Sequence, residues 1–279
     1  MAEKWFDIKK DDVTPDYAVD IWRSLELHIF PSLSSIPITE INAPQIIKLL
    51  KPIEAKGSLE TVKRLTQRLN EVMNFATNCG LVHANPLSGI KAAFKKPKKE
   101  NMAALKPAEL PELMGAIANA SIKRTTRCLI EWQLHTMTRP SEASGAKWAE
   151  INWEEKVWSI PAERMKKRRE HRIPLTDQML ELLEVIKPIS GHREFIFPSD
   201  RDPKKPCNSQ TANMALKRMG FAGRLVSHGL RSLASTTLNE QGFDRDLVEA
   251  ALAHVDDNQV RSAYNRTDYL ERRKPMMCW

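Results

Sequence analysis

A lysine-rich stretch interrupted by proline limits most strongly how this chain can fold. Residues 91–100 read K-A-A-F-K-K-P-K-K-E, with five lysines, one glutamate and one proline. Such a composition does not pack readily into a core, and its proline interrupts regular structure. A chain of 279 residues also exceeds the usual size of a single domain. We therefore predict two domains, residues 1–92 and 107–279, joined by a basic linker over residues 93–106.

The region before the linker has helical periodicity. Apolar residues recur at intervals of three and four over residues 15–30, which predicts an amphipathic helix that ends at Pro31. Asn42 is placed to cap a helix over residues 43–54, and Ser58 is placed to cap a longer one. The longer helix has an apolar stripe that should be buried: Val62, Leu65, Leu69, Val72, Met73 and Ala76. No convincing strand precedes residue 150.

Helical patterns also dominate the rest of the chain, apart from one short region. Residues 151–161, I-N-W-E-E-K-V-W-S-I-P, read as two strands around a turn, and H-R-I-P-L at 171–175 reads as a third. Between the later strands, E-R-M-K-K-R-R-E at 163–170 reads as a basic hairpin tip that is too polar to be core. The predicted fold class is mainly α with a small antiparallel β-sheet.

Net charge, cysteine spacing and hydropathy limit, in turn, the kind of partner, the chance of a disulfide or zinc site, and the location of the protein. The chain has 43 Lys and Arg against 35 Asp and Glu, a net charge of +8, which favours a polyanionic partner without naming one. Its four cysteines form no C-x-x-C pair and have no histidine at zinc-ligand spacing, so we expect neither a disulfide framework nor a zinc site. The first residues are charged where a signal peptide needs an apolar core, and no run approaches membrane-spanning length. We expect a soluble, intracellular protein.

Two short segments place cationic side chains at predicted helix starts. In T-M-T-R-P-S-E-A, Arg139 precedes Pro140, so one helix must end there and another begins. Taken alone, Glu142 in this segment is better explained as a cap or an ion-pair partner than as a chemical group. In S-H-G-L-R, His228 and Arg231 share one face near a helix N-terminus, which favours an anion. Taken alone, this second pattern is more often a capping histidine and a surface arginine.

A third segment carries a candidate nucleophile. L-A-H-V-D-D-N-Q-V-R-S-A-Y-N-R, residues 252–266, places Tyr264 ten positions after His254, beside Arg261 and Arg266. A packed aromatic residue with solvated arginines is the commoner explanation of such a pattern. Because the reference pKa of tyrosine is about 10, a reactive tyrosine needs cations and a base around it.

Taken together, these segments resemble the tyrosine recombinases, or phage integrases, and within them the prophage integrases related to those of satellite phages. T-R-P-S-E-A is similar to the family's first arginine box, S-H-G-L-R to its His-x-x-Arg box, and L-A-H followed by Y-N-R to its histidine and nucleophile box. The 23 residues from Arg231 to His254 fit the family's spacing. The ten residues from His254 to Tyr264 are one more than in many integrases, and Tyr269 is the only nearby rival.

The resemblance implies a helical, SAM-like core-binding domain followed by a tyrosine-recombinase catalytic domain. Nothing in the chain resembles the family's N-terminal arm-binding domain, and its end, M-M-C-W, lacks a helix stop signal, so we expect a shortened chain. The implied activity is site-specific recombination, in which DNA is cut and rejoined through a 3′-phosphotyrosyl intermediate to integrate or excise a prophage or genomic island. No metal, ATP or other cofactor is implied.

The resemblance also implies roles for single residues. Arg139 and Arg231 would bind the phosphate, His228 would assist deprotonation of the tyrosine and His254 would hydrogen-bond the phosphate. The family's lysine lies eight residues before the proline of I-P, which gives Lys166 as general acid, with Lys167 left open. The implied catalytic set is Arg139, Lys166, His228, Arg231, His254 and Tyr264. The implied DNA contacts are Lys95, Lys96, Lys98, Lys99, Lys167, Arg168 and Arg169. Taken alone, the lysines before residue 100 are better explained as a solvated hinge than as a DNA contact.

The implied partners are double-stranded DNA attachment core sites, three further copies of the chain on synapsed DNA, a directionality factor and a DNA-bending protein. The implied location is the cytoplasm of a bacterial host, with the nucleoid and without a membrane contact. Three rival hypotheses stay open: a type IB topoisomerase, a non-catalytic fragment that binds a core site, and a helical scaffold with coincidental motifs.

Overall fold

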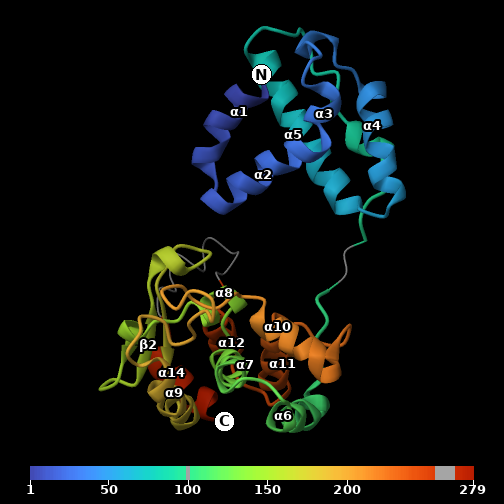
Figure 1. Ribbon diagram of the computed structural model, residues 1–279. Helices are drawn as coiled ribbons and strands as arrows, with labels where there is room; N and C mark the ends of the chain where they lie inside the picture. The colour runs from blue at the N-terminus through green and yellow to red at the C-terminus, as the bar shows by residue number, and fades with distance from the viewer. Residues whose placement is uncertain (99–100, 255–267) are drawn as a thin grey trace. The chain divides into compact units, whose positions relative to one another are not determined.

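The computed structural model describes residues 1–98, 101–254 and 268–279, and it divides into two compact units, Met1–Glu100 and Asn101–Trp279 (Figure 1). Each unit has its own hydrophobic core, as an independent domain requires. The two ends of the predicted linker belong to these cores, since Phe94 is buried in the first and Leu105 in the second. None of the described helices combines the length and apolar character needed to cross a membrane.

The first unit is all helical over its described residues. Its α-helices are α1 (Ala2–Lys9), α2 (Pro15–His28), α3 (Phe30–Leu33), α4 (Ala43–Ala55) and α5 (Leu59–Asn78). Short 3₁₀ turns occupy Lys10–Asp12, Ile38–Glu40 and Ile90–Ala93.

The helix boundaries in this unit match the predictions only in part. Asn42 caps α4 as predicted: its Oδ1 accepts from the Gln45 N–H at 3.1 Å, and the Gln45 Oε1 accepts from the Asn42 N–H at 3.0 Å. The prediction for Pro31 was wrong, because α2 ends at His28 and Pro31 lies in the first turn of α3, where a missing N–H costs nothing. Ser58 precedes α5 but makes no side-chain cap bond, because its backbone (φ −80°, ψ 57°) is not extended.

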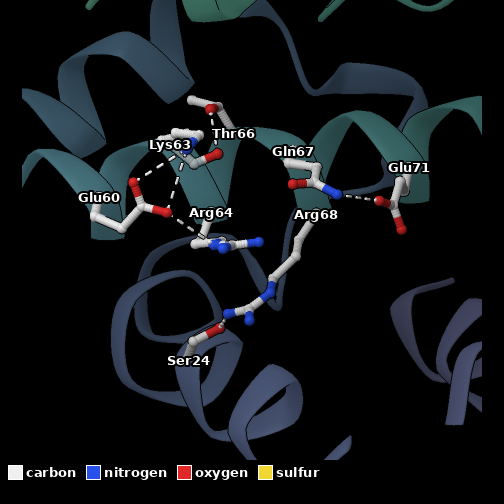
Figure 2. A network of polar contacts seen from close by, with 8 residues as sticks. All are labelled: Ser24, Glu60, Lys63, Arg64, Thr66, Gln67, Arg68 and Glu71. Carbon is white, nitrogen blue, oxygen red and sulfur yellow. Dashed lines mark hydrogen bonds and ion pairs between the residues drawn. The ribbon is translucent and has the colours of Figure 1, made fainter. Parts of the chain in front are cut away.

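Helix α5 has an apolar face and a polar face. All six residues of the predicted stripe are buried. Figure 2 shows the polar face, where Glu60 accepts from Lys63 at 3.1 Å and from Arg64 at 3.1 Å, since residues three and four apart are neighbours on a helix. Arg68 extends in another direction, and its guanidinium donates to the Ser24 hydroxyl on α2 (Figure 2). This buried arginine therefore ties α5 to α2.

The second unit combines helices with an antiparallel sheet of three strands in the order β1–β2–β3. The strands are β1 (Ile151–Asn152), β2 (Val157–Ile160) and β3 (His171–Pro174). The α-helices are α6 (Leu110–Asn119), α7 (Arg124–Thr136), α8 (Pro140–Ser144), α9 (Asp177–Ser190), α10 (Thr211–Leu216), α11 (Gly229–Glu240), α12 (Arg245–Ala251) and α14 (Leu270–Cys278). The predicted fold class, mainly α with a small antiparallel sheet, is confirmed.

The sheet packs into the core of the second unit through β2. Trp158 on β2 and Trp132 on α7 are fully buried, with ring centroids 4.9 Å apart. Ile160 pairs with His171, so β2 and β3 form a hairpin around residues 161–170. The prediction that this tip is too polar for the core was wrong for Met165, which belongs to the hydrophobic core of this unit. Met165 is 5% exposed there, and the preceding Arg164 side chain is 19% exposed because it pairs with a buried glutamate.

Candidate active site

The first arginine segment lies where α7 ends and α8 begins. Met137 takes a left-handed conformation (φ 53°) after α7, and Arg139 occupies the N-cap position of α8. The buried Glu142 carboxylate turns back onto this cap: Oε2 accepts from the Arg139 backbone N–H at 2.8 Å, and Oε1 accepts from the Arg139 Nη1 at 2.8 Å. Glu142 therefore both caps the helix and fixes the arginine that precedes it.

Arg231 is a buried residue and not the surface arginine that its motif alone would suggest. It lies in the first turn of α11 and is 4% exposed. Its Nη1 donates to the carbonyl oxygen of Met137, and its Nη2 donates to that of Leu252 at 2.7 Å. Burial, followed by the charge of Arg139, lowers the pKa of Arg231 to about 10, so it remains a cation at pH 7. It links the α7–α8 junction to the segment that follows α12.

His228 precedes α11 at a firmly anchored position. The neighbouring Ser227 hydroxyl donates to Gln133 Oε1 at 2.7 Å, and Gln133 Nε2 donates to the Ser227 carbonyl oxygen at 2.8 Å. On the other side, a Cβ on Gly229 would lie 2.2 Å from the Ala103 carbonyl oxygen, so only glycine allows this approach of the two backbones. Both neighbours of His228 are therefore held by the core.

The turn after α12 places His254 beside Arg231. Ala253 is left-handed (φ 49°), and His254 Nε2 lies 3.5 Å from Arg231 Nη2. The other ring nitrogen, Nδ1, lies 2.7 Å from Glu249 Oε2. A carboxylate on one nitrogen orients a histidine ring and favours a proton on that nitrogen.

The gathered side chains act on one another electrostatically. Burial, then the charges of Arg231 and Arg139, lower the pKa of His228 below its ordinary value of 6.5, while Glu142 acts in the opposite direction. His228 is therefore neutral at pH 7 and is free to accept a proton. Two fixed guanidiniums beside a neutral imidazole make a site suited to a phosphate group and to proton transfer at its edge.

The structure thus brings Arg139, His228, Arg231 and His254 together from three distant segments. Tyr264 lies outside the described residues, as do Arg261 and Arg266. Its rival Tyr269 lies at the start of α14, where the guanidinium of Arg272 stands over its ring at 5.2 Å from the centroid.

Lys166 lies in the loop formed by residues 161–170 and is exposed, as is Lys167. The basic residues beside it, Arg168 and Arg169, are also exposed. Among the linker lysines, Lys95 is anchored through its backbone N–H to Glu54 at 2.7 Å, and Lys96 and Lys98 are both exposed. Lys99 lies outside the described residues.

Two buried cationic or titratable residues near the site were missed from the sequence. Arg273 on α14 is fully buried, and it donates to the carbonyl oxygens of Ala250 and Arg172. His171 on β3 is 7% exposed. The alternation of β3, in which His171 and Ile173 share the buried face, could have indicated this histidine; no sequence signal indicates Arg273.

The protonation of His171 gives a prediction about stability. Burial, then the charge of Arg273, and further those of Arg231 and Arg139, lower the pKa of His171 to about 3 from 6.5, whereas a hydrogen bond to the Ala251 backbone opposes the change. Between these two values the unfolded chain binds a proton that the folded protein does not, so stability falls as the pH falls. The contribution of His171 approaches about 1.4 kcal/mol per pH unit in that window.

Glutamine cannot titrate. As the pH is lowered from 6.5 to 4.5, the free energy of unfolding of His171→Gln should therefore fall less steeply than that of wild type. Urea unfolding at several pH values measures the two curves. Parallel curves would contradict the assigned environment of His171.

Two models of known protein families together match most of the chain. Residues 103–271 match the model of the "Phage integrase family", and residues 1–93 match that of the "Phage integrase central domain". The chain is 58% identical over 279 residues to "Prophage integrase IntA" of Escherichia coli (strain K12), which covers all of this chain and 68% of that protein. It is 32% identical to "Integrase" of Enterobacteria phage P4, again over the whole chain and over 67% of that protein.

Solved structures show the same fold. A crystal structure of a lambda integrase dimer bound to a COC′ core site matches with a TM-score of 0.73 at 21% identity, covering 92% of this chain and 96% of that one. A lambda integrase tetramer bound to a Holliday junction matches with a TM-score of 0.73 at 22% identity, covering 92% and 77% of the two chains.

Proposed function

Because the chain belongs to the phage integrase family, we propose that it is a site-specific integrase that cuts and rejoins DNA through a tyrosine at its active site. The main support for this proposal is the position of four residues. Arg139, His228, Arg231 and His254 come from three segments far apart in sequence and lie close together in one cationic site. The second unit would be the catalytic domain, and the first unit, up to residue 92, would be the core-binding domain.

The cleavage step is an in-line phosphoryl transfer. The Tyr264 oxygen forms a bond to the DNA phosphorus, the bond from phosphorus to the 5′-oxygen breaks, and the product is a 3′-phosphotyrosyl linkage. Charge grows on the two non-bridging oxygens in the transition state, and the guanidiniums of Arg139 and Arg231 are fixed in place to receive it. The phosphotyrosyl bond keeps the energy of the phosphodiester, so rejoining needs no ATP.

Two further residues would transfer protons, and a third would bind the phosphate. His228 is neutral at pH 7 and would take the proton that leaves Tyr264. Lys166 would donate a proton to the departing 5′-oxygen, with Lys167 as the alternative donor. His254, oriented by Glu249, would hydrogen-bond the phosphate.

DNA binding would draw on the basic residues of both units. The proposed phosphate contacts are Lys95, Lys96, Lys98, Lys99, Lys167, Arg168 and Arg169. Such contacts supply affinity that weakens as salt rises, because bound counterions are released from the DNA. We further propose four copies on two synapsed core sites, by analogy with the lambda integrase tetramer, together with a directionality factor and a DNA-bending protein, in the bacterial cytoplasm at the nucleoid.

Strand exchange tests this function. The protein is incubated with two labelled duplexes that carry a core site and, separately, with supercoiled plasmid that contains the same site. We expect recombinant duplexes in the first reaction. Relaxation of the plasmid without exchange would favour the topoisomerase alternative, and salt-dependent binding without any cleavage would favour the DNA-binding fragment.

A further inference from the structure

An arginine at the root of the Lys166 loop joins that loop to the helix of the first active-site arginine. Arg164 ends a short 3₁₀ turn, Ala162–Arg164, two residues before Lys166. Its Nη2 donates to the main-chain carbonyl oxygen of Glu142 on α8 at 2.7 Å. The carboxylate of the same Glu142 holds Arg139, so one residue connects the two arginines.

The other nitrogen of the Arg164 fork is tied to the sheet. Nη1 lies 2.5 Å from both carboxylate oxygens of Glu150, whose side chain is 7% exposed. Glu150 Oε2 also accepts from the Trp158 Nε1 on β2 at 2.9 Å and from the Lys147 N–H at 3.1 Å. The guanidinium therefore spans α8, the sheet and the root of the loop.

The fit of Arg164 against α8 is close enough to restrict the residue opposite. A Cβ on Gly145 would lie 2.8 Å from Arg164 Nη2 and 3.1 Å from the Ser141 carbonyl oxygen. Gly145 has an ordinary backbone (φ −90°), so what favours glycine here is the space occupied by the guanidinium. The guanidinium therefore lies against Gly145 as well as hydrogen-bonding to Glu142 and Glu150.

We propose that Arg164 is a positioning residue for the general acid. Lys166 is exposed and on its own has many conformations, which cost free energy to restrict. Because Arg164 fixes the loop, two residues before Lys166, to the helix that follows Arg139, it directs the lysine toward the same phosphate that Arg139 binds. This inference rests on the proposed function.

The test separates proton donation from every other requirement of cleavage. In a normal core-site duplex the lysine N–H bond breaks, the 5′-oxygen gains the proton, and the bond from phosphorus to that oxygen breaks. In a duplex with a 5′-bridging sulfur at the scissile position, the thiolate leaves without a proton. A misplaced general acid therefore slows the first reaction and leaves the second nearly unchanged.

Arg164→Met should cut the normal duplex about 10²-fold more slowly than wild type, the lower end of general-acid contributions, and the sulfur duplex within a few-fold. Lys166→Ala should show the same pattern if Lys166 is the acid. Arg164→Lys should not restore the oxygen rate, since one ammonium cannot replace the fork that contacts Glu150 and Glu142 together. Single-turnover rates of covalent complex formation measure each case.

Arg127→Met is the matched control. Arg127 Nη2 also donates to a backbone carbonyl, that of Ala120 at 2.9 Å, but it lies in the first turn of α7, at the end opposite to Met137. Both of its rates should equal those of wild type. A folded Arg164→Met protein that cuts both duplexes equally slowly, or both at the wild-type rate, would overturn the inference. If wild type cuts neither duplex, the proposed function itself fails.

Discussion

Replacing Arg231 with lysine should lower the rate of DNA cleavage by about 10³-fold, because a developing phosphate charge then loses a fixed donor. Arg231 uses its two terminal nitrogens to hold the carbonyl oxygens of Met137 and Leu252, and it is almost fully buried. A lysine has a single ammonium group without the planar fork, so it cannot bind a phosphate and keep both carbonyl contacts.

Cleavage and binding should respond differently to this change. Single-turnover formation of the covalent complex reports the chemical step, and an electrophoretic mobility shift at fixed salt reports DNA binding. Binding should change little, because one phosphate contact among many is altered. Arg272→Lys is the matched control, since Arg272 lies exposed on α14 and pairs with Asp244 at 3.0 Å. A wild-type cleavage rate for Arg231→Lys would contradict the role assigned to Arg231.

The local parts of the site could be predicted because their signals lie within a few residues. The Arg139–Pro140 junction requires one helix to end and another to begin, and the structure places α8 there. The three-residue spacing of His228 and Arg231 put both at the start of one helix, where α11 begins. Capping by Asn42 could be predicted for the same reason, since its partner Gln45 is three residues away.

The supporting contacts could not be predicted because their partners are remote in sequence. Arg164 meets a carboxylate 14 residues before it and a carbonyl 22 residues before it. Arg273 reaches a carbonyl 101 residues away. The burial of Arg231 likewise depends on Met137, 94 residues earlier. No spacing rule connects such pairs, so a motif identifies the candidate residues and the tertiary fold decides which of them are buried and fixed.

Replacing Tyr264 with phenylalanine should abolish covalent attachment of the protein to DNA. The change removes only the attacking oxygen, so no bond to phosphorus can form, whereas the cationic site of Arg139 and Arg231 remains able to bind the phosphate. Tyr269→Phe is the matched control, because Tyr269 is the nearest other tyrosine and lies at the start of α14. That variant should form the adduct as wild type does.

Mapping the site of that attachment shows directly whether Tyr264 is the nucleophile. The protein is incubated with nicked duplexes that trap the cleaved state, taken from a pool of candidate core sites, and the adduct is isolated on a denaturing gel and mapped by mass spectrometry. We expect a DNA-linked peptide that contains Tyr264, present in wild type and Tyr269→Phe and absent in Tyr264→Phe. An adduct that persists in Tyr264→Phe, or a verified core site that is bound without any adduct, would contradict the role of Tyr264 as the nucleophile.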